Sequence, residues 1–291
     1  MSRFRTLADQ QSWESTMAYK DILLLLETGD TTAVAAPYAV ALASQFGAHL
    51  TASGVAFEIM PPASFMGGEY PYEALAAVTE EARRRAEEAY ALMRQSAPAG
   101  LATEIVQIDA FPGQARDEFA RLARHFDLTV AAQSPIDGSD EQGLAEAALF
   151  GAGRPVLIVP RIHKGAPKFG RALVAWDGSR AAARALADAM PLLKKAEVVE
   201  VVSVTDHRVS YKELPGFNIT RHLSRHGLNA QLKRLTIQGD IGDTLLSYAA
   251  DAGSDFLVMG GYGHSRLREM ILGGTTRTIL SSMTIPILIS H

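Results

Sequence analysis

Short hydrophobic runs alternate with longer amphipathic segments along most of this chain. The runs are apolar nearly throughout, rather than at every second position, which is typical of strands covered on both faces of a parallel sheet. They fall into two sets of five: 22–26, 50–56, 104–108, 128–132 and 156–159, then 172–176, 198–204, 231–237, 256–259 and 285–290. The pattern predicts an α/β protein with two tandem five-stranded parallel sheets.

An internal repeat supports two similar domains. The sequence PGQARD at 112–117 precedes a helical pattern and then DLTV at 127–130, and QGDIGD at 238–243 precedes DFLV at 255–258 in the same way. The closing runs, RPVLIV and IPILIS, also resemble each other. Between the two copies, 163–168 contains Gly165 and Pro167, which break regular structure. The predicted domains are 19–162 and 169–291, with the boundary near residue 165.

Local sequence signals predict one helix clearly and leave the limits of its counterpart in the first domain open. After the strand that ends at Trp176, Ser179 is a candidate N-cap, and 186, 189, 190 and 193 form one apolar stripe. The equivalent helix of the first domain contains Pro37, which costs about 3 kcal/mol in a helix interior. We therefore expect that helix either to start near Pro37 or to be kinked.

Charge and composition narrow the class of protein. The chain has 291 residues, 28 basic against 32 acidic side chains and a net charge of −4, which argues against a nucleic-acid partner. It contains no cysteine, so disulfides and thiolate sites are excluded. Its apolar runs are too short to span a bilayer, and the first 20 residues lack the apolar core of a signal peptide. We expect a cytoplasmic protein with no membrane partner.

The strongest local signal is a glycine-rich segment after the strand 256–259. Gly260, Gly261 and Gly263 follow the strand, and Gly273, Gly274, Thr275 and Thr276 open a helix that runs to about 282. Glycines allow a close backbone approach to a ligand, and the free N–H groups at a helix start can bind phosphate. The spacing fits neither a dinucleotide fingerprint nor a P-loop. Glycines after a buried strand can also serve tight turns only, so this alternative stays open.

The spacing Gly260-x2-Gly263-x9-Gly273 resembles the nucleotide loop of universal stress proteins, which continues with Ser or Thr. The opening run LVAWDGS at 173–179 and the closing run PILI at 286–289 are similar to the family's first and last strands. The resemblance covers 169–291 and, more weakly, 19–160. It implies five-stranded, Rossmann-like domains of the adenine nucleotide α-hydrolase type, with ATP held between the first strand and the glycine loop. Whether Mg²⁺ accompanies the ATP stays open.

The resemblance also implies which residues bind the nucleotide. Asp177 would face the adenine or ribose end, and the backbone of Val204 would meet adenine. The ribose and phosphates would lie against the loop and the start of the following helix, at Gly260, Gly263, Gly273, Gly274 and Thr275. Gly274 departs from the family motif, which has a hydroxyl residue there; Thr275 is the candidate replacement.

The first domain departs further from the motif. After the strand 128–132 comes QSPIDG, without Gly-x2-Gly, and only Gly151 and Gly153 resemble the second half of the motif. Glu27 stands in the place of Asp177, and acidic residues at 137, 140, 141 and 146 would repel a triphosphate. We expect this domain to have a degenerate site and a structural or partner-binding function.

Other candidates for chemistry are weaker. His222 and His226 are spaced to share one helical face, but a solvated face explains them better than a metal site. His264 lies inside the glycine loop, where it could contact phosphate or solvent.

No nucleophile or general base can be assigned, so the favoured function is a nucleotide-responsive stress-response module and not an enzyme. The alternatives are a nucleotide-independent interaction protein and a slow ATPase or related hydrolase. The resemblance further implies pairing of the closing strands 156–159 and 285–290 within the chain, and a homodimer is a further option.

Overall fold

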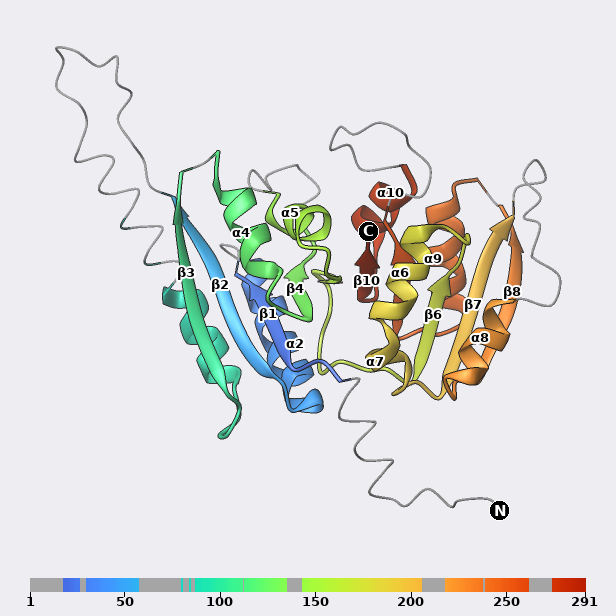
Figure 1. Cartoon of the computed structure of the whole chain (residues 1–291), viewed down its shortest axis with the longest axis horizontal. Coiled ribbons are helices and arrows are strands. Elements are labelled where there is room, and N and C mark those ends of the chain that lie inside the picture. The colour runs from blue at the N-terminus through green and yellow to red at the C-terminus, as the bar shows by residue number, and fades with distance from the viewer. Residues whose placement is uncertain are drawn as a thin grey trace, which may run out of the picture.

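Ten strands form one mostly parallel sheet in the described parts of the chain (Figure 1). The computed structural model describes residues 18–26, 30–57, 80, 84, 87–111, 113–134, 143–205, 218–237, 239–261 and 274–291. Along the sheet the strand order is β3-β2-β1-β4-β5-β10-β9-β6-β7-β8. The strands are β1 (Asp21–Leu25), β2 (His49–Phe57), β3 (Thr103–Ala110), β4 (Leu128–Ala132), β5 (Val156–Val159), β6 (Arg171–Ala175), β7 (Val198–Thr205), β8 (Ala230–Thr236), β9 (Phe256–Gly260) and β10 (Ile287–Ser290). All ten predicted strands are present.

The sheet consists of two halves with the same internal order. In the N-terminal half, residues 18–160, the parallel order is β3-β2-β1-β4-β5, and in the C-terminal half, residues 169–291, it is β8-β7-β6-β9-β10. The halves meet where β5 and β10 pair antiparallel, with Leu157 opposite Leu288. This is the closing-strand pairing that the family resemblance implies. The domain limits 19–162 and 169–291 stay predictions.

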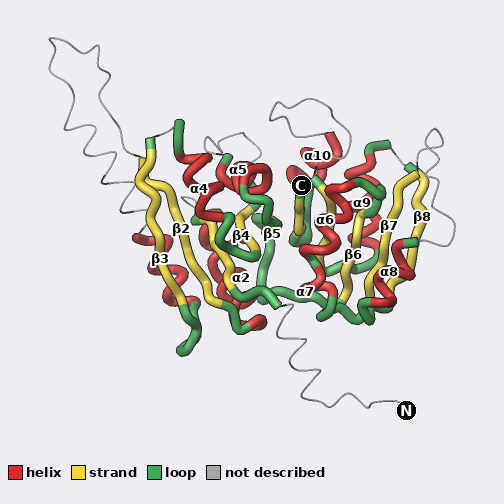
Figure 2. Tube along the Cα trace, viewed as in Figure 1, coloured by secondary structure: helices red, strands yellow, loops and turns green. Residues whose placement is uncertain are grey.

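Helices cover both faces of the sheet (Figure 2). One buried apolar cluster contains residues of α2, of the helical residues 87–96, and of α6, α7 and α8; the other contains residues of α4, α5, α9 and α10. Each cluster includes strand residues from both halves, so each apolar layer continues across the β5–β10 junction. The helices are α2 (Asp30–Phe46), α4 (Ala115–Ala123), α5 (Leu144–Gly151), α6 (Arg180–Asp188), α7 (Met190–Leu193), α8 (Ile219–Arg225), α9 (Ile241–Asp251) and α10 (Gly274–Ser282).

The two outermost strands are less buried than their sequence runs indicate. In β3 and β8 most residues are exposed or half-buried, whereas β1, β4, β5 and β10 are buried almost throughout. A parallel-sheet strand is covered on both faces only where helices lie over it, and these two strands are the edges of the sheet. The expectation of full burial was therefore wrong for the edges.

The structure agrees with the sequence prediction for one of the two helices discussed above and differs from it for the other. Ser179 caps α6 as predicted, because its side chain accepts a hydrogen bond from the Ala182 N–H at 3.1 Å. The apolar stripe that follows is buried but divided between α6 and α7, with Pro191 in the first turn of α7. By contrast, α2 runs through Pro37, so a start near that proline was wrong. The fully buried Tyr38 and Leu42 indicate that tertiary packing offsets the cost of the proline.

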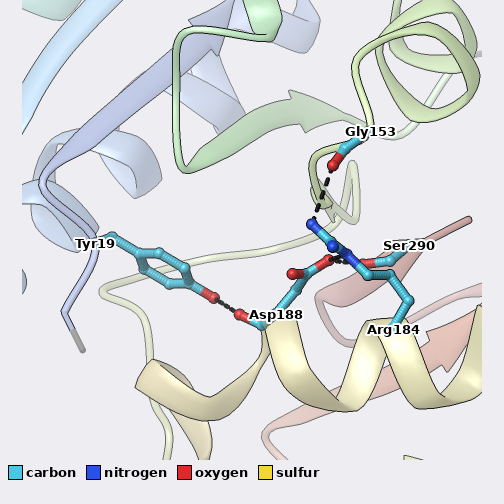
Figure 3. A network of polar contacts seen from close by, with 5 residues as sticks. All are labelled: Tyr19, Gly153, Arg184, Asp188 and Ser290. Atoms are coloured by element: carbon cyan, nitrogen blue, oxygen red, sulfur yellow. Dashed lines mark hydrogen bonds and ion pairs between the residues drawn. The ribbon is translucent and has the colours of Figure 1, made fainter.

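A polar network crosses from one half to the other at the end of α6 (Figure 3). The Asp188 carboxylate accepts hydrogen bonds from Arg184 Nε at 2.8 Å and from Ser290 Oγ at 3.0 Å. Arg184 Nη2 also donates to the Gly153 carbonyl of the N-terminal half, at 3.1 Å. From the same half, the Tyr19 hydroxyl donates to the Asp188 carbonyl at 2.7 Å. Burial raises the pKa of Tyr19, which keeps its hydroxyl protonated as a donor.

Removing that hydroxyl tests the network. Tyr19→Phe is expected to lower the free energy of unfolding by about 1 kcal/mol, because the last carbonyl of α6 loses its donor from the other half. Urea unfolding followed by circular dichroism measures the change. Ser96→Ala, which removes an exposed local bond to the Leu92 carbonyl, is the control and should stay within about 0.5 kcal/mol of the wild type. Equal effects of the two substitutions would contradict the assignment.

Candidate functional site

The candidate site lies at the switch point of the C-terminal half. From β6 the chain continues outward to β7 and β8, then returns to β9 on the other side of β6. In open α/β sheets, ligands bind outside the carboxyl ends of the strands at such a point. Asp177 follows β6, Val204 is near the end of β7 and Gly260 ends β9, so the structure brings these three predicted residues to one edge. Gly263 and Gly273 lie outside the described residues, as does His264.

Asp177 forms the turn between β6 and α6. Its Oδ1 accepts a hydrogen bond from the Ser179 N–H at 2.9 Å, which orders the entry to the helix. The residue is exposed, and its negative charge is favourable next to the N-terminus of α6. Asp177 therefore has a structural function in addition to the predicted contact with a ligand.

Val204 extends past the end of its neighbouring strand. β6 pairs with β7 only as far as Ala175 opposite Val202, and the Trp176 N–H then donates to the Val202 carbonyl at 2.8 Å. Backbone groups of a strand point alternately to its two neighbours, so Val204 directs its N–H and C=O to the same side as Val202. On that side β6 has already turned away. The Val204 backbone can therefore offer one donor and one acceptor to a planar base.

Gly260 is required by packing as well as by any ligand. A Cβ at this position would lie 2.4 Å from the Ala182 nitrogen and 2.6 Å from the Ala181 carbonyl carbon, which are backbone atoms in the first turn of α6. The absence of a side chain thus lets α6 approach the end of β9. Sequence reasoning explained this glycine by its closeness to a nucleotide and missed the helix.

Helix α10 begins at Gly274 in the described part of the chain. A Cβ built at Gly274 would meet no atom of the described residues within 4 Å. Thr275 is half-buried beside it, and Thr276 is buried. The free N–H groups of such a helix start favour an anion. Gly274 and Thr275 therefore lie at a helix start, where an anion would be favoured.

Gly242 is a residue that the sequence reasoning missed. A Cβ at this position would lie 3.0 Å from Thr278 Cβ and 3.1 Å from Ile279 Cγ1, so the glycine lets α9 and α10 pack closely. The internal repeat contained the signal, because the first copy has Arg116 at the same place as Gly242 in the second. A glycine that differs between repeats indicates a local difference in packing.

The equivalent edge of the N-terminal half is built differently. Ala132 and Gln133 correspond to Gly260 and Gly261, since Gln133 N donates to Val159 O and Gly261 N to Ser290 O, both at 2.8 Å. The match of Gly151 to the second half of the glycine motif was wrong. Gly151 ends α5, and its missing Cβ makes room for Ala120 at 2.7 Å, whereas the helix starts after Gly143. Gly153 lies beyond the same end.

Two further observations bear on charge. Glu146 forms an ion pair with Arg116 at 3.6 Å, so part of the negative charge expected in the first half is compensated. Glu27 and the acids at 137, 140 and 141 lie outside the described residues.

Among the described residues no three His, Cys, Asp or Glu side chains gather as a metal site would need, and the rings of His222 and His226 contact each other with centroids 4.7 Å apart. None of the helices in the described ranges is long and apolar enough to cross a membrane.

Comparisons with known proteins agree with this fold. The model of the universal stress protein family matches residues 168–291. Universal stress protein Slr1230 of Synechocystis sp. is 24% identical over 292 residues, covering 92% of this chain and 99% of that protein. A universal stress protein structure from Archaeoglobus fulgidus has a TM-score of 0.68 at 16% identity, covering 93% of this chain and 95% of its own. A functionally unknown protein from Pseudomonas aeruginosa has a TM-score of 0.56 at 16% identity, covering 95% and 94%.

These structures, at such low identity, show the fold alone: a tandem arrangement of adenine nucleotide α-hydrolase-like sheets. The family model shows more, because it covers the half of the chain that contains the switch point, Gly260 and α10. Residues 168–291 therefore match the universal stress protein family, and the whole chain is similar in fold to a universal stress protein of similar length.

Proposed function

We infer that this protein is a cytoplasmic stress-response module that binds an adenine nucleotide, ATP in the first place, in its C-terminal half and acts through binding. The observation that carries the proposal is the convergence of three features at one switch point. They are the backbone of Val204 beyond the end of β6, the side-chain-free end of β9 at Gly260, and the N-terminus of α10 at Gly274. The end of β9 and the start of α10 are connected by the loop whose spacing resembles the family's nucleotide loop.

The residues present fit the parts of ATP. Val204 can offer its backbone N–H and C=O to the edge of adenine, and the Asp177 carboxylate can accept hydrogen bonds from the ribose or base. The first N–H groups of α10, with the Thr275 hydroxyl, would bind phosphate. Any Mg²⁺ would be held mainly by the phosphate oxygens, as is usual for this ion.

Direct analysis of bound nucleotide tests the proposal. Purified protein is denatured, released small molecules are identified by mass spectrometry, and apo protein is titrated with ATP by calorimetry. We expect close to equimolar binding, and its loss when Gly263 or Gly273 is replaced by leucine. Folded protein that gives no heat at millimolar ATP would overturn the proposal and favour a nucleotide-independent interaction protein. Phosphate release above the buffer level that disappears in Asp177→Asn would overturn the statement that the protein acts by binding.

Gly274→Ser is expected to strengthen ATP binding roughly fivefold, the value of one added hydrogen bond of about 1 kcal/mol. The substitution restores the hydroxyl that the family motif has at this place, and no atom of the residues that the structure describes lies within 4 Å of the added Cβ. Calorimetric titration measures the dissociation constant. Gly274→Ala adds the same Cβ without the hydroxyl and is the matched control. Equal affinities of the two variants would show that the hydroxyl makes no contact with the nucleotide.

A further inference from the structure

Gln133 connects the two halves of the protein at the helix of the proposed phosphate site. It follows β4 in the N-terminal half and is only 6% exposed. Its Nε2 donates to the Leu280 carbonyl at 2.7 Å and to the Ser281 carbonyl at 3.2 Å, both in the last turn of α10. Its Oε1 accepts from the Arg161 N–H at 3.1 Å, just after β5. The three contacts fix the amide orientation, because the donors face carbonyls and the acceptor faces an N–H.

The last carbonyls of an α-helix have no partner within the helix, so a buried helix end needs donors from elsewhere. For α10 the donor comes from the other half of the protein. In the N-terminal half, the corresponding helix α5 has a donor from its own half. Arg124 Nε donates to the Gly151 carbonyl at the end of α5, at 3.0 Å. The residue equivalent to Gln133 in the C-terminal half is Gly261, which has no side chain to return the contact.

The hydrogen bonds of Gln133 therefore run from the half with the degenerate site to the helix of the proposed site, and Gly261 makes no equivalent side-chain bond. We propose that Gln133 is a positioning residue for α10, so that the N-terminal half holds the phosphate-binding helix of the C-terminal half in place. This inference rests on the proposed nucleotide site. Helix α10 is short, so a constraint on its last turn also limits the position of its first turn, where Gly274 and Thr275 lie. Affinity for the nucleotide and pairing of the two halves are then linked, and each strengthens the other.

The experiment compares full-length variants by hydrogen exchange and by ATP titration. Gln133→Met keeps the length of the side chain and removes its polar atoms, and Gln133→Ala is the second variant in case the first disturbs packing. Gln45→Ala is the control, because Gln45 Nε2 also donates from the N-terminal half to a backbone carbonyl, that of Pro167, which lies outside α10. Exchange of the amides of 274–282 is followed in the absence and in the presence of ATP.

In the Gln133 variants we expect exchange in 274–282 to increase about 25-fold, since each of the two lost hydrogen bonds to α10 is worth about fivefold, and ATP affinity to fall by a similar factor. ATP should restore part of the protection. The control should leave both quantities unchanged even if it lowers the unfolding midpoint. Unchanged exchange in 274–282 would contradict the claim that the Gln133 hydrogen bonds hold α10 in place. Increased exchange with wild-type affinity would overturn the positioning function. Failure of the wild type to bind ATP would instead overturn the proposed function, and with it the linkage, while exchange would still report whether Gln133 holds α10.

Discussion

Gly260→Ala is expected to destabilise the protein by about 3 kcal/mol, which is the upper part of the usual range for overpacking. The added Cβ would lie 2.4 Å from the Ala182 nitrogen, and a second backbone atom, the Ala181 carbonyl carbon, is at 2.6 Å. Because these atoms belong to a helix backbone, no side-chain rotation can relieve the overlap. Either α6 or the end of β9 must move.

The same movement would disturb the candidate site. Ser179 caps α6 through the Ala182 N–H, and Asp177 orders the turn before it, so a displaced helix changes the positions of both. We therefore expect ATP affinity to fall together with stability, the first measured by calorimetry at a temperature where the variant is still folded and the second by urea unfolding. Gly274→Ala is the matched control, since the same added group meets no atom within 4 Å in the described ranges of the chain. If Gly260→Ala unfolded at the wild-type urea concentration, the close approach of α6 would be refuted.

Leu288→Ala is expected to lower the free energy of unfolding by about 2–5 kcal/mol, the range measured for removing a buried leucine side chain. Leu288 is fully buried in β10, opposite Leu157 of β5, in an apolar cluster that includes residues of both halves. The cavity would therefore open at the junction itself. Urea unfolding measures the loss, and limited proteolysis during the transition reports which half becomes accessible.

Because each apolar layer crosses the junction, we expect both halves of the Leu288→Ala variant to unfold in one transition. Leu92→Ala is the control; Leu92 is 42% exposed, and its truncation should change stability by no more than about 0.5 kcal/mol. Two separate transitions, with one half cleaved while the other stays resistant, would show that the halves are independent folding units. That result would also weaken the linkage proposed through Gln133.

Several features of the fold follow from local sequence signals. The strands were predictable because each is a short, nearly continuous run of β-branched and leucine residues. Ser179 was predictable as a cap for the same reason, since it bonds to a residue only three positions along the chain. The repeat then indicated two similar halves, and the glycine spacing indicated the family and the edge of the sheet where a ligand would bind.

Other features depend on contacts between residues far apart in the chain, and only the tertiary structure decided them. Pro37 inside α2 is tolerated because of packing around it. The partial exposure of β3 and β8 results from their positions in the sheet order, which no single run contains. The sequence by itself determined the strands, the repeat and the resemblance of the C-terminal half to universal stress proteins. The close approach of α6 to Gly260 and the bonds from Gln133 to α10 were decided by the tertiary structure, because they depend on distances between elements that local patterns do not specify.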